Sequence, residues 1–118
     1  MILTGVKTPY CIENASIQVV RAWQGHKVER RWFLAVRGSF TIKTIKIDKW
    51  EKPSKDLVPF EFILDAQSLE SLALPAGYIS SIQQLKNYSK LMVFADYELG
   101  EIQDEYRYDA DYFKVSTY

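Results

Sequence analysis

The chain has 118 residues, 47% hydrophobic and 25% charged, an ordinary composition that predicts one globular domain spanning residues 1–118. Fifteen basic and fifteen acidic residues cancel, and no basic stripe stands out, which argues against nucleic acid as a partner. A single cysteine, Cys11, and no apolar run near the ~20 residues of a membrane helix predict a cytoplasmic protein without internal disulfides or membrane spans.

Short runs rich in β-branched and aromatic residues follow one another along the chain. The predicted strands cover residues 16–23, 31–36, 39–48, 59–64, 68–74, 78–85 and 90–97. Arg37-Gly38 and Pro75-Ala76-Gly77 predict turns, and the polar segment 49–57 predicts a loop. Only Leu99 to Tyr106 has the pattern of a short helix. Turns at intervals of roughly 8–12 residues are typical of an all-β sandwich or barrel.

The strand predicted over residues 39–48 has an irregular hydrophobic pattern. Its apolar residues are Phe40, Ile42, Ile45 and Ile47, so the alternation skips one step near Lys43-Thr44 and then resumes. An extra residue in one strand of an antiparallel pair has this effect on the alternation, and the pattern therefore predicts a β-bulge.

The one histidine, His26, lies in the segment 21–27, which reads Arg-Ala-Trp-Gln-Gly-His-Lys. With Gly38 aligned to the motif's glycine, this region resembles the first cupin motif, and Gln24, His26 and Arg31 occupy its ligand positions. Residues 75–80, Pro-Ala-Gly-Tyr-Ile-Ser, resemble the second motif, with Ser80 at its ligand position. One imidazole cannot hold a transition metal, and Arg31 would repel a cation. The resemblance implies a cupin-type double-stranded β-helix, a jelly-roll barrel, without its metal.

Finer detail resembles the metal-free cupins that act on nucleotide sugars, the dTDP-4-keto-6-deoxyglucose 3,4-ketoisomerases and dTDP-4-dehydrorhamnose 3,5-epimerases. Arg21, His26 and Lys27 match the isomerase motif Arg-Gly-x-His-Ala-His-Lys, and a Gly-Ser pair follows His26 at the same spacing. Near the C-terminus, the segments 95–97 and 106–113 match further isomerase elements. The resemblance covers residues 17 to 113. It implies a homodimer that takes a nucleotide sugar, with a dTDP-sugar favoured, and no cofactor.

Two departures from these families concern the reacting groups. Gln24 stands where the isomerases have the first histidine of their pair and where the epimerases have their base. Glutamine cannot relay a proton by titrating. Met92 stands where the epimerases have a tyrosine acid, four residues before Asp96. The usual epimerase pair is therefore absent.

A 3,4-ketoisomerase must move a carbon-bound proton and stabilise an enediolate oxygen. His26 is the candidate base, because it alone titrates near neutral pH without perturbation. Gln24, two residues away on the same strand face, is the candidate hydrogen-bond partner of the oxyanion. Strict alternation places Arg21 on the opposite face, so Arg21 joins the site only if a bulge falls between it and Gln24. The candidate substrate-binding residues are Arg21, Lys27, Arg31, Tyr78 and Ser80.

These features support two functions of different classes. The first is an isomerase or epimerase that acts on a nucleotide-linked 4-keto-6-deoxysugar by metal-free proton transfer, in polysaccharide precursor synthesis. The second is a non-catalytic cupin that binds a sugar or nucleotide sugar, which the amide of Gln24 in place of a titrating group favours. A purely structural dimer module is a third reading, and it predicts that no ligand binds.

Overall fold

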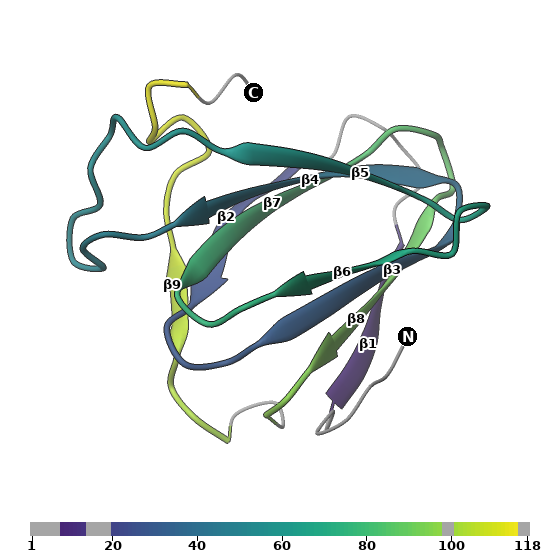
Figure 1. The fold of residues 1–118 in the computed structure, drawn as a ribbon, viewed down its shortest axis with the longest axis horizontal. Coiled ribbons are helices and arrows are strands. Elements are labelled where there is room, and N and C mark those ends of the chain that lie inside the picture. The colour runs from purple at the N-terminus through teal and green to yellow at the C-terminus, as the bar shows by residue number, and fades with distance from the viewer. Residues whose placement is uncertain (1–7, 14–19, 98–100, 116–118) are drawn as a thin grey trace.

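The computed structural model describes residues 8–13, 20–97 and 101–115, and its regular structure is antiparallel β-sheet. The strands are β1 (Thr8–Glu13), β2 (Val20–His26), β3 (Arg31–Arg37), β4 (Ser39–Lys46), β5 (Phe60–Asp65), β6 (Ser71–Leu74), β7 (Tyr78–Gln84), β8 (Lys90–Ala95) and β9 (Glu105–Arg107). A four-stranded sheet, in the order β1-β8-β3-β6, faces a five-stranded sheet, in the order β5-β4-β7-β2-β9 (Figure 1). The predicted all-β jelly-roll class is confirmed. No helix in the described part of the chain is long and apolar enough to cross a membrane.

Most strand predictions agree with the structure, and the differences lie at the ends of the chain and at one turn. The strand predicted from residue 16 begins at Val20 in β2, and residues 16–19 lie outside the described ranges. The strand predicted from residue 68 begins only at Ser71, because the Asp65 carboxylate and carbonyl accept hydrogen bonds from Gln67 and Ser68 and close a turn. Both predicted turns and the predicted loop are present.

Two short strands were not predicted. β1 contains a proline, which is tolerated because β1 lies at a sheet edge and pairs only with β8. β9 forms at the end of the segment with the helix-like pattern, so the helix prediction is wrong for its described residues 101–106, and residues 99–100 lie outside the description. Pairing of β9 with the edge of β2 supplies cross-strand hydrogen bonds, whereas an isolated helix of this length is only marginally stable in water.

The predicted bulge in β4 is wrong. The strand pairs without a register shift from Ser39 to Thr44 with β5 and from Phe40 to Lys46 with β7. The hydrophobic pattern skips a step because β4 packs in two different clusters on its two faces. Phe40 and Ile42 belong to the core between the sheets, whereas Ile45 and Ile47 belong to a cluster with Trp23.

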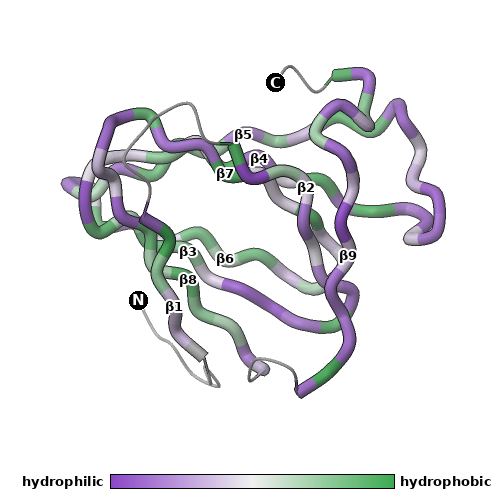
Figure 2. The backbone as a smooth tube through the Cα atoms, turned by 180° about the vertical axis from the view of Figure 1, so that it is seen from behind, coloured by the Kyte–Doolittle hydropathy of each residue, from purple (hydrophilic) through white to green (hydrophobic). Residues whose placement is uncertain are grey.

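The core between the two sheets fills one part of the barrel and forms the floor of the site described below. Its buried members are Ile12, Phe33, Ala35, Phe40, Ile42, Leu64, Leu74, Ile82, Leu91 and Val93. Figure 2 shows this hydrophobic character along β6 and β8, and a largely hydrophilic chain through β9. Each fully buried side chain of this kind contributes about 1.5–3 kcal/mol relative to exposure.

The second cluster ties the C-terminal segment to the outer face of the five-stranded sheet. Its buried members are Trp23, Ile45, Ile47, Ile79 and Phe113. The rings of Trp23 and Phe113 pack edge to face with centroids 5.5 Å apart. Backbone hydrogen bonds of 2.9 and 3.0 Å join Trp23 and Tyr108 in both directions. This attachment holds the adjoining strand β9 against β2 (Figure 1), and Glu105 and Tyr106 of β9 line the cavity described below.

Candidate functional site

A cavity of about 930 Å³ opens between the two sheets. Its walls come from β1, β2, β3, β6 and β7 and from residues 102–106 of the C-terminal segment. Ile12, Phe33, Leu74 and Ile82 of the core form an apolar floor, and polar and charged side chains lie above them. This size and composition are typical of small-molecule sites, which combine apolar walls with a few converging polar groups.

Five of the seven residues predicted for the site line this cavity. They are Arg21, Gln24, His26, Arg31 and Ser80. Lys27 is exposed in the turn after β2 and is not part of the lining. Tyr78 pairs with His26 across β2 and β7, but it lines a separate, smaller cavity of about 160 Å³ beside Phe60 and Phe62.

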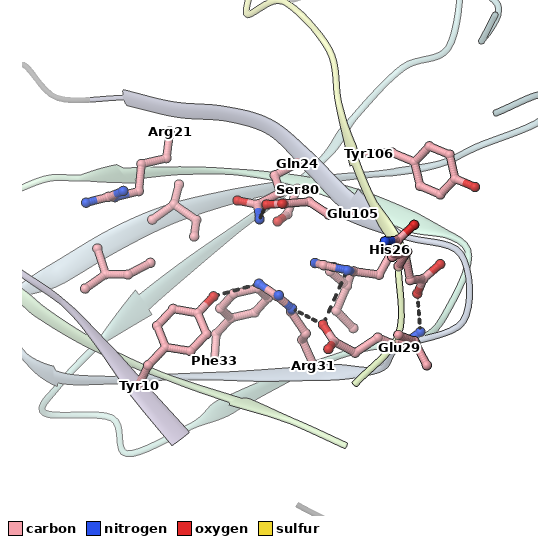
Figure 3. Close-up of a pocket in the computed structure, with 16 residues that line it drawn as sticks. Tyr10, Arg21, Gln24, His26, Glu29, Arg31, Phe33, Ser80, Glu105 and Tyr106 are labelled. Carbon is pink, nitrogen blue, oxygen red and sulfur yellow. Dashed lines mark hydrogen bonds and ion pairs between the residues drawn. The ribbon is translucent and has the colours of Figure 1, made fainter. Parts of the chain in front are cut away.

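Arg21 reaches the cavity because the register of β2 shifts. The pairing of β2 with β7 is irregular between Arg21 and Gln24, which is where the sequence argument required a bulge. The irregularity places Arg21, Gln24 and His26 in one cavity, while Trp23 between them is buried in the outer cluster. Figure 3 shows Arg21 at the end of the cavity away from His26.

The imidazole of His26 is positioned by Glu29. His26 is 8% exposed, and its Nδ1 lies 3.3 Å from Oε2 of Glu29. A carboxylate only accepts hydrogen bonds, so we assign the ring hydrogen to Nδ1. Nε2 is buried and has no hydrogen-bond partner in the described part of the chain. His26 is among the residues that line the cavity, and Figure 3 shows its ring at the cavity wall, so the lone pair of Nε2 lies at the edge of the site without a partner among the described residues.

The surroundings keep the imidazole uncharged near neutral pH. Burial lowers the pKa of His26 below its ordinary value of 6.5, and the nearby Arg31 guanidinium lowers it further. The carboxylates of Glu29, Asp104 and Glu105 act in the opposite direction but do not reverse the shift. A neutral imidazole with an unpartnered nitrogen is the form that accepts a proton.

Arg31 joins Glu29 to Tyr10, a site residue that sequence reasoning missed. Its Nε donates to Oε2 of Glu29 at 2.7 Å, and its Nη1 donates to the hydroxyl oxygen of Tyr10 at 2.6 Å. A guanidinium has no acceptor, so the Tyr10 hydroxyl hydrogen is not used in this contact. Burial raises the pKa of Tyr10, which keeps the phenol protonated. The alternation Tyr10-Cys11-Ile12 was the one sequence feature that could have placed this residue on a strand facing the site.

Gln24 is held at the other side of the cavity. Its amide Nε2 donates to Oε1 of Glu105 on β9, and that oxygen also accepts from Nη2 of Arg107 at 2.7 Å. Gln24 pairs directly with Ser80 across β2 and β7, so both side chains lie on one sheet face. The hydrogen bond to Glu105 orients the amide, which could not be predicted because Glu105 is 81 residues away along the chain.

The structure also shows where Met92 lies and whether a group of metal ligands is present. Leu91 and Val93 are buried in the core, so alternation along β8 turns Met92 to the opposite face, and it does not line the cavity. Within residues 8–13, 20–97 and 101–115, no three His, Cys, Asp or Glu side chains are placed to hold a metal ion.

Comparison with known proteins gives a likeness of fold. No protein-family model matches the sequence, and neither does any curated protein. Among solved structures, dTDP-4-dehydrorhamnose 3,5-epimerase from Bacillus anthracis aligns with 81% of this chain at a TM-score of 0.69 and 15% identity. An epimerase from Mycobacterium tuberculosis aligns with 87% of the chain at a TM-score of 0.70 and 17% identity.

A third solved structure belongs to an isomerase. A mutant of the 3,4-ketoisomerase QdtA from Thermoanaerobacterium thermosaccharolyticum, in complex with TDP-4-keto-6-deoxyglucose, aligns with 94% of this chain at a TM-score of 0.70 and 18% identity. The present chain spans 72% of that protein, but only 56% and 51% of the two epimerases. The resemblance predicted from the motifs is thus confirmed at the level of architecture: this chain has the fold of the dTDP-sugar 3,5-epimerases and 3,4-ketoisomerases.

Proposed function

We propose that this protein is an isomerase of the sugar-nucleotide ketoisomerase and epimerase type. Its substrate would be a nucleotide-linked 4-keto-6-deoxysugar, and its role the synthesis of polysaccharide precursors. The observation that carries the proposal is the buried, unpartnered Nε2 of a neutral His26, which faces a cavity of about 930 Å³. A dTDP-sugar is favoured as the substrate because one solved epimerase with this fold holds TDP and one solved isomerase holds TDP-4-keto-6-deoxyglucose.

The reaction needs one base for carbon and one acid for oxygen. His26 Nε2 removes the hydrogen from the carbon next to the carbonyl, and the electron pair of that C–H bond forms an enediolate. The Tyr10 hydroxyl donates to the carbonyl oxygen as negative charge develops there. The neighbouring hydroxyl then returns a proton to Tyr10 while His26 delivers its own to the former carbonyl carbon. All protons are returned, and neither oxidant nor reductant is consumed.

Ketoisomerisation is favoured over 3,5-epimerisation by the position of these groups. Met92, where the epimerases have their tyrosine acid, lies on the outer face of β8 and cannot protonate a ligand in the cavity. Arg21 and Arg31 add two cationic groups to the lining, and such groups bind the oxygens of a diphosphate. Ser80 and Gln24 supply neutral polar groups for sugar hydroxyls.

The test is a binding and exchange screen with dTDP, UDP and GDP sugars, including their 4-keto-6-deoxy forms, in deuterated buffer. Thermal stabilisation by one sugar, together with deuterium entering the carbon next to its carbonyl, is the expected result. Incubation of the same sugars without protein, and with the His26→Asn variant, controls for spontaneous exchange. A sugar that stabilises the protein and never exchanges would refute catalysis.

A non-catalytic sugar-binding role is the second candidate, and the fixed amide of Gln24 favours it. Hydrogen bonding to Glu105 orients this amide as recognition requires, and an amide does not transfer protons by titration. Binding without exchange in the screen would establish this role. A homodimer, which the resemblance implies, stays a prediction that sedimentation equilibrium tests.

A further inference from the structure

The β2–β3 turn that carries Glu29 is bound by a carboxylate from a distant part of the chain. Oδ1 of Asp104 accepts the backbone N–H of Lys27 at 2.9 Å, and Oδ2 accepts those of Val28 at 2.8 Å and Glu29 at 2.7 Å. Asp104 is 7% exposed and precedes β9. Three consecutive backbone donors that converge on one anion form a stable arrangement, because each hydrogen bond to a charged acceptor is strong.

We propose that Asp104 is a positioning residue, which fixes the turn so that Glu29 meets His26 and sets the tautomer of the imidazole. Glu29 follows His26 by three residues and its carboxylate reaches back to Nδ1, so their separation depends on the shape of residues 27–29. Asp104 holds the backbone of all three. Its effect on the proposed base therefore passes through Glu29, and the inference rests on the proposed function only in calling His26 a base.

The arrangement also connects the cavity wall to the base. Residues 102–106 line the cavity, and Asp104 in their middle is the link to the turn that orients His26. Asp104→Asn removes the charge and turns one of the two acceptor oxygens into an NH2 donor, so at least one turn N–H group loses its acceptor and faces a donor, which favours another turn conformation. Glu29 would then no longer face Nδ1, and the ring could carry its hydrogen on Nε2, the nitrogen that must be bare to accept a proton.

The test uses the fact that the chain contains one histidine. In protein with ¹⁵N-labelled histidine, the imidazole gives one pair of nitrogen resonances, whose shifts report the tautomer without any substrate. The Nδ1–H tautomer is expected in the unaltered protein, and an Nε2–H tautomer there would overturn the inference without any variant. In Asp104→Asn, we expect a shift towards the Nε2–H tautomer.

Asp96→Asn is the matched control. Asp96 binds the same turn at its other end, where its carboxylate accepts hydrogen bonds from the backbone N–H and Nε of Arg30 at 2.8 and 2.9 Å. We expect this variant to keep the Nδ1–H tautomer. If Asp104→Asn folds and also keeps it, Asp104 is only a structural cap and the inference fails.

Turnover provides a second readout if the proposed function holds. We expect Asp104→Asn to lower kcat by about 10–100-fold, by analogy with the loss of groups that orient metal-binding histidines, while KM changes little. The reverse split, an unchanged kcat with a raised KM, would contradict the positioning role. If the unaltered protein shows no turnover, the proposed function fails while the tautomer measurement still decides the role of Asp104.

Discussion

Oε2 of Glu29 lies 3.3 Å from Nδ1 of His26 and accepts a 2.7 Å hydrogen bond from Nε of Arg31. One carboxylate oxygen thus orients the imidazole of His26. It also offsets the positive charge of the Arg31 guanidinium, which would otherwise repel a proton on the imidazole. Because Glu29 is 9% exposed, these contacts are little screened by water.

Replacement of His26 by asparagine tests the base directly. Asparagine cannot accept a proton near neutral pH, so we expect turnover or solvent exchange to fall by about 10²–10⁴-fold, the usual contribution of a positioned base. Circular dichroism and thermal unfolding should show that the fold is retained. Full activity in a folded His26→Asn protein would remove His26 from the mechanism.

The pH dependence follows from the lowered pKa of His26. The unfolded chain binds this proton near pH 6.5, whereas the folded protein binds it only at lower pH, because burial and Arg31 oppose the charge. The contribution of neutral His26 to the free energy of unfolding is therefore fully present above pH 6.5. It is lost as the pH falls from 6.5 through the pKa of His26 in the folded protein. Urea unfolding across this range should show a steeper loss in the unaltered protein than in His26→Asn. A His26 resonance that titrates at or above 6.5 would contradict this.

Tyr10 is expected to be the oxygen-side donor. Tyr10→Phe removes one hydroxyl and should lower kcat by about 10²–10³-fold, as for the loss of one oxyanion donor, with KM within a few-fold. Tyr106→Phe is the control, since Tyr106 lines the same cavity but its ring packs at a tilt against Trp50, with centroids 4.6 Å apart. Equal rates for the two variants would show that the Tyr10 hydroxyl plays no part.

Phe113 should be essential to the attachment of the C-terminal segment. It is 1% exposed and packs against Trp23, so Phe113→Ala is expected to lower the free energy of unfolding by about 3–5 kcal/mol. Val115→Ala, at a residue that is 48% exposed two positions further on, should change it by less than about 0.5 kcal/mol. Urea denaturation measures both, and similar values would mean that the second cluster contributes little.

Two glycines should differ in their tolerance of alanine. A Cβ at Gly25, between Gln24 and His26, would overlap Ile79 and the carbonyl oxygen of Tyr78, so Gly25→Ala must displace β2 from β7 and disturb the cavity. At Gly77, with φ of 93°, no described atom lies within 4 Å of a Cβ, and only the backbone conformation costs about 1–2 kcal/mol. Ligand binding should therefore weaken in Gly25→Ala and persist in Gly77→Ala.

The architecture could be predicted because strands and turns depend on residues that are close together in the sequence. Alternation and turn residues located β3, β5, β7 and β8 and the turn at Gly38, where φ is 71°. The alternation rule also stated the condition under which Arg21 reaches the site, a bulge before Gln24, and the structure has a register shift at that place. The alternation rule failed in β4. There the hydrophobic pattern skips one step because the strand changes its packing partner, and no residue is inserted.

The rest of the site could not be predicted because it depends on contacts between distant segments. Asp104 meets the turn of Glu29 75 residues away, and Arg31 meets Tyr10 21 residues away. No spacing rule encodes such pairs, and only the pairing of β9 with β2 and of β1 with β8 brings them together. Tyr78 is the opposite case. Its sequence position beside a motif turn predicted that it would join the site, but its side chain lines the smaller cavity instead.

The two packing partners of β4 have a consequence for unfolding. This strand supplies Phe40 and Ile42 to one cluster and Ile45 and Ile47 to the other, without a break between them. A one-residue slip would exchange the two faces and place the wrong side chains in both clusters at once. The cavity floor and the C-terminal attachment therefore share one cooperative unit. Amide hydrogens along β4 should exchange at a single, global opening free energy rather than in two separate steps.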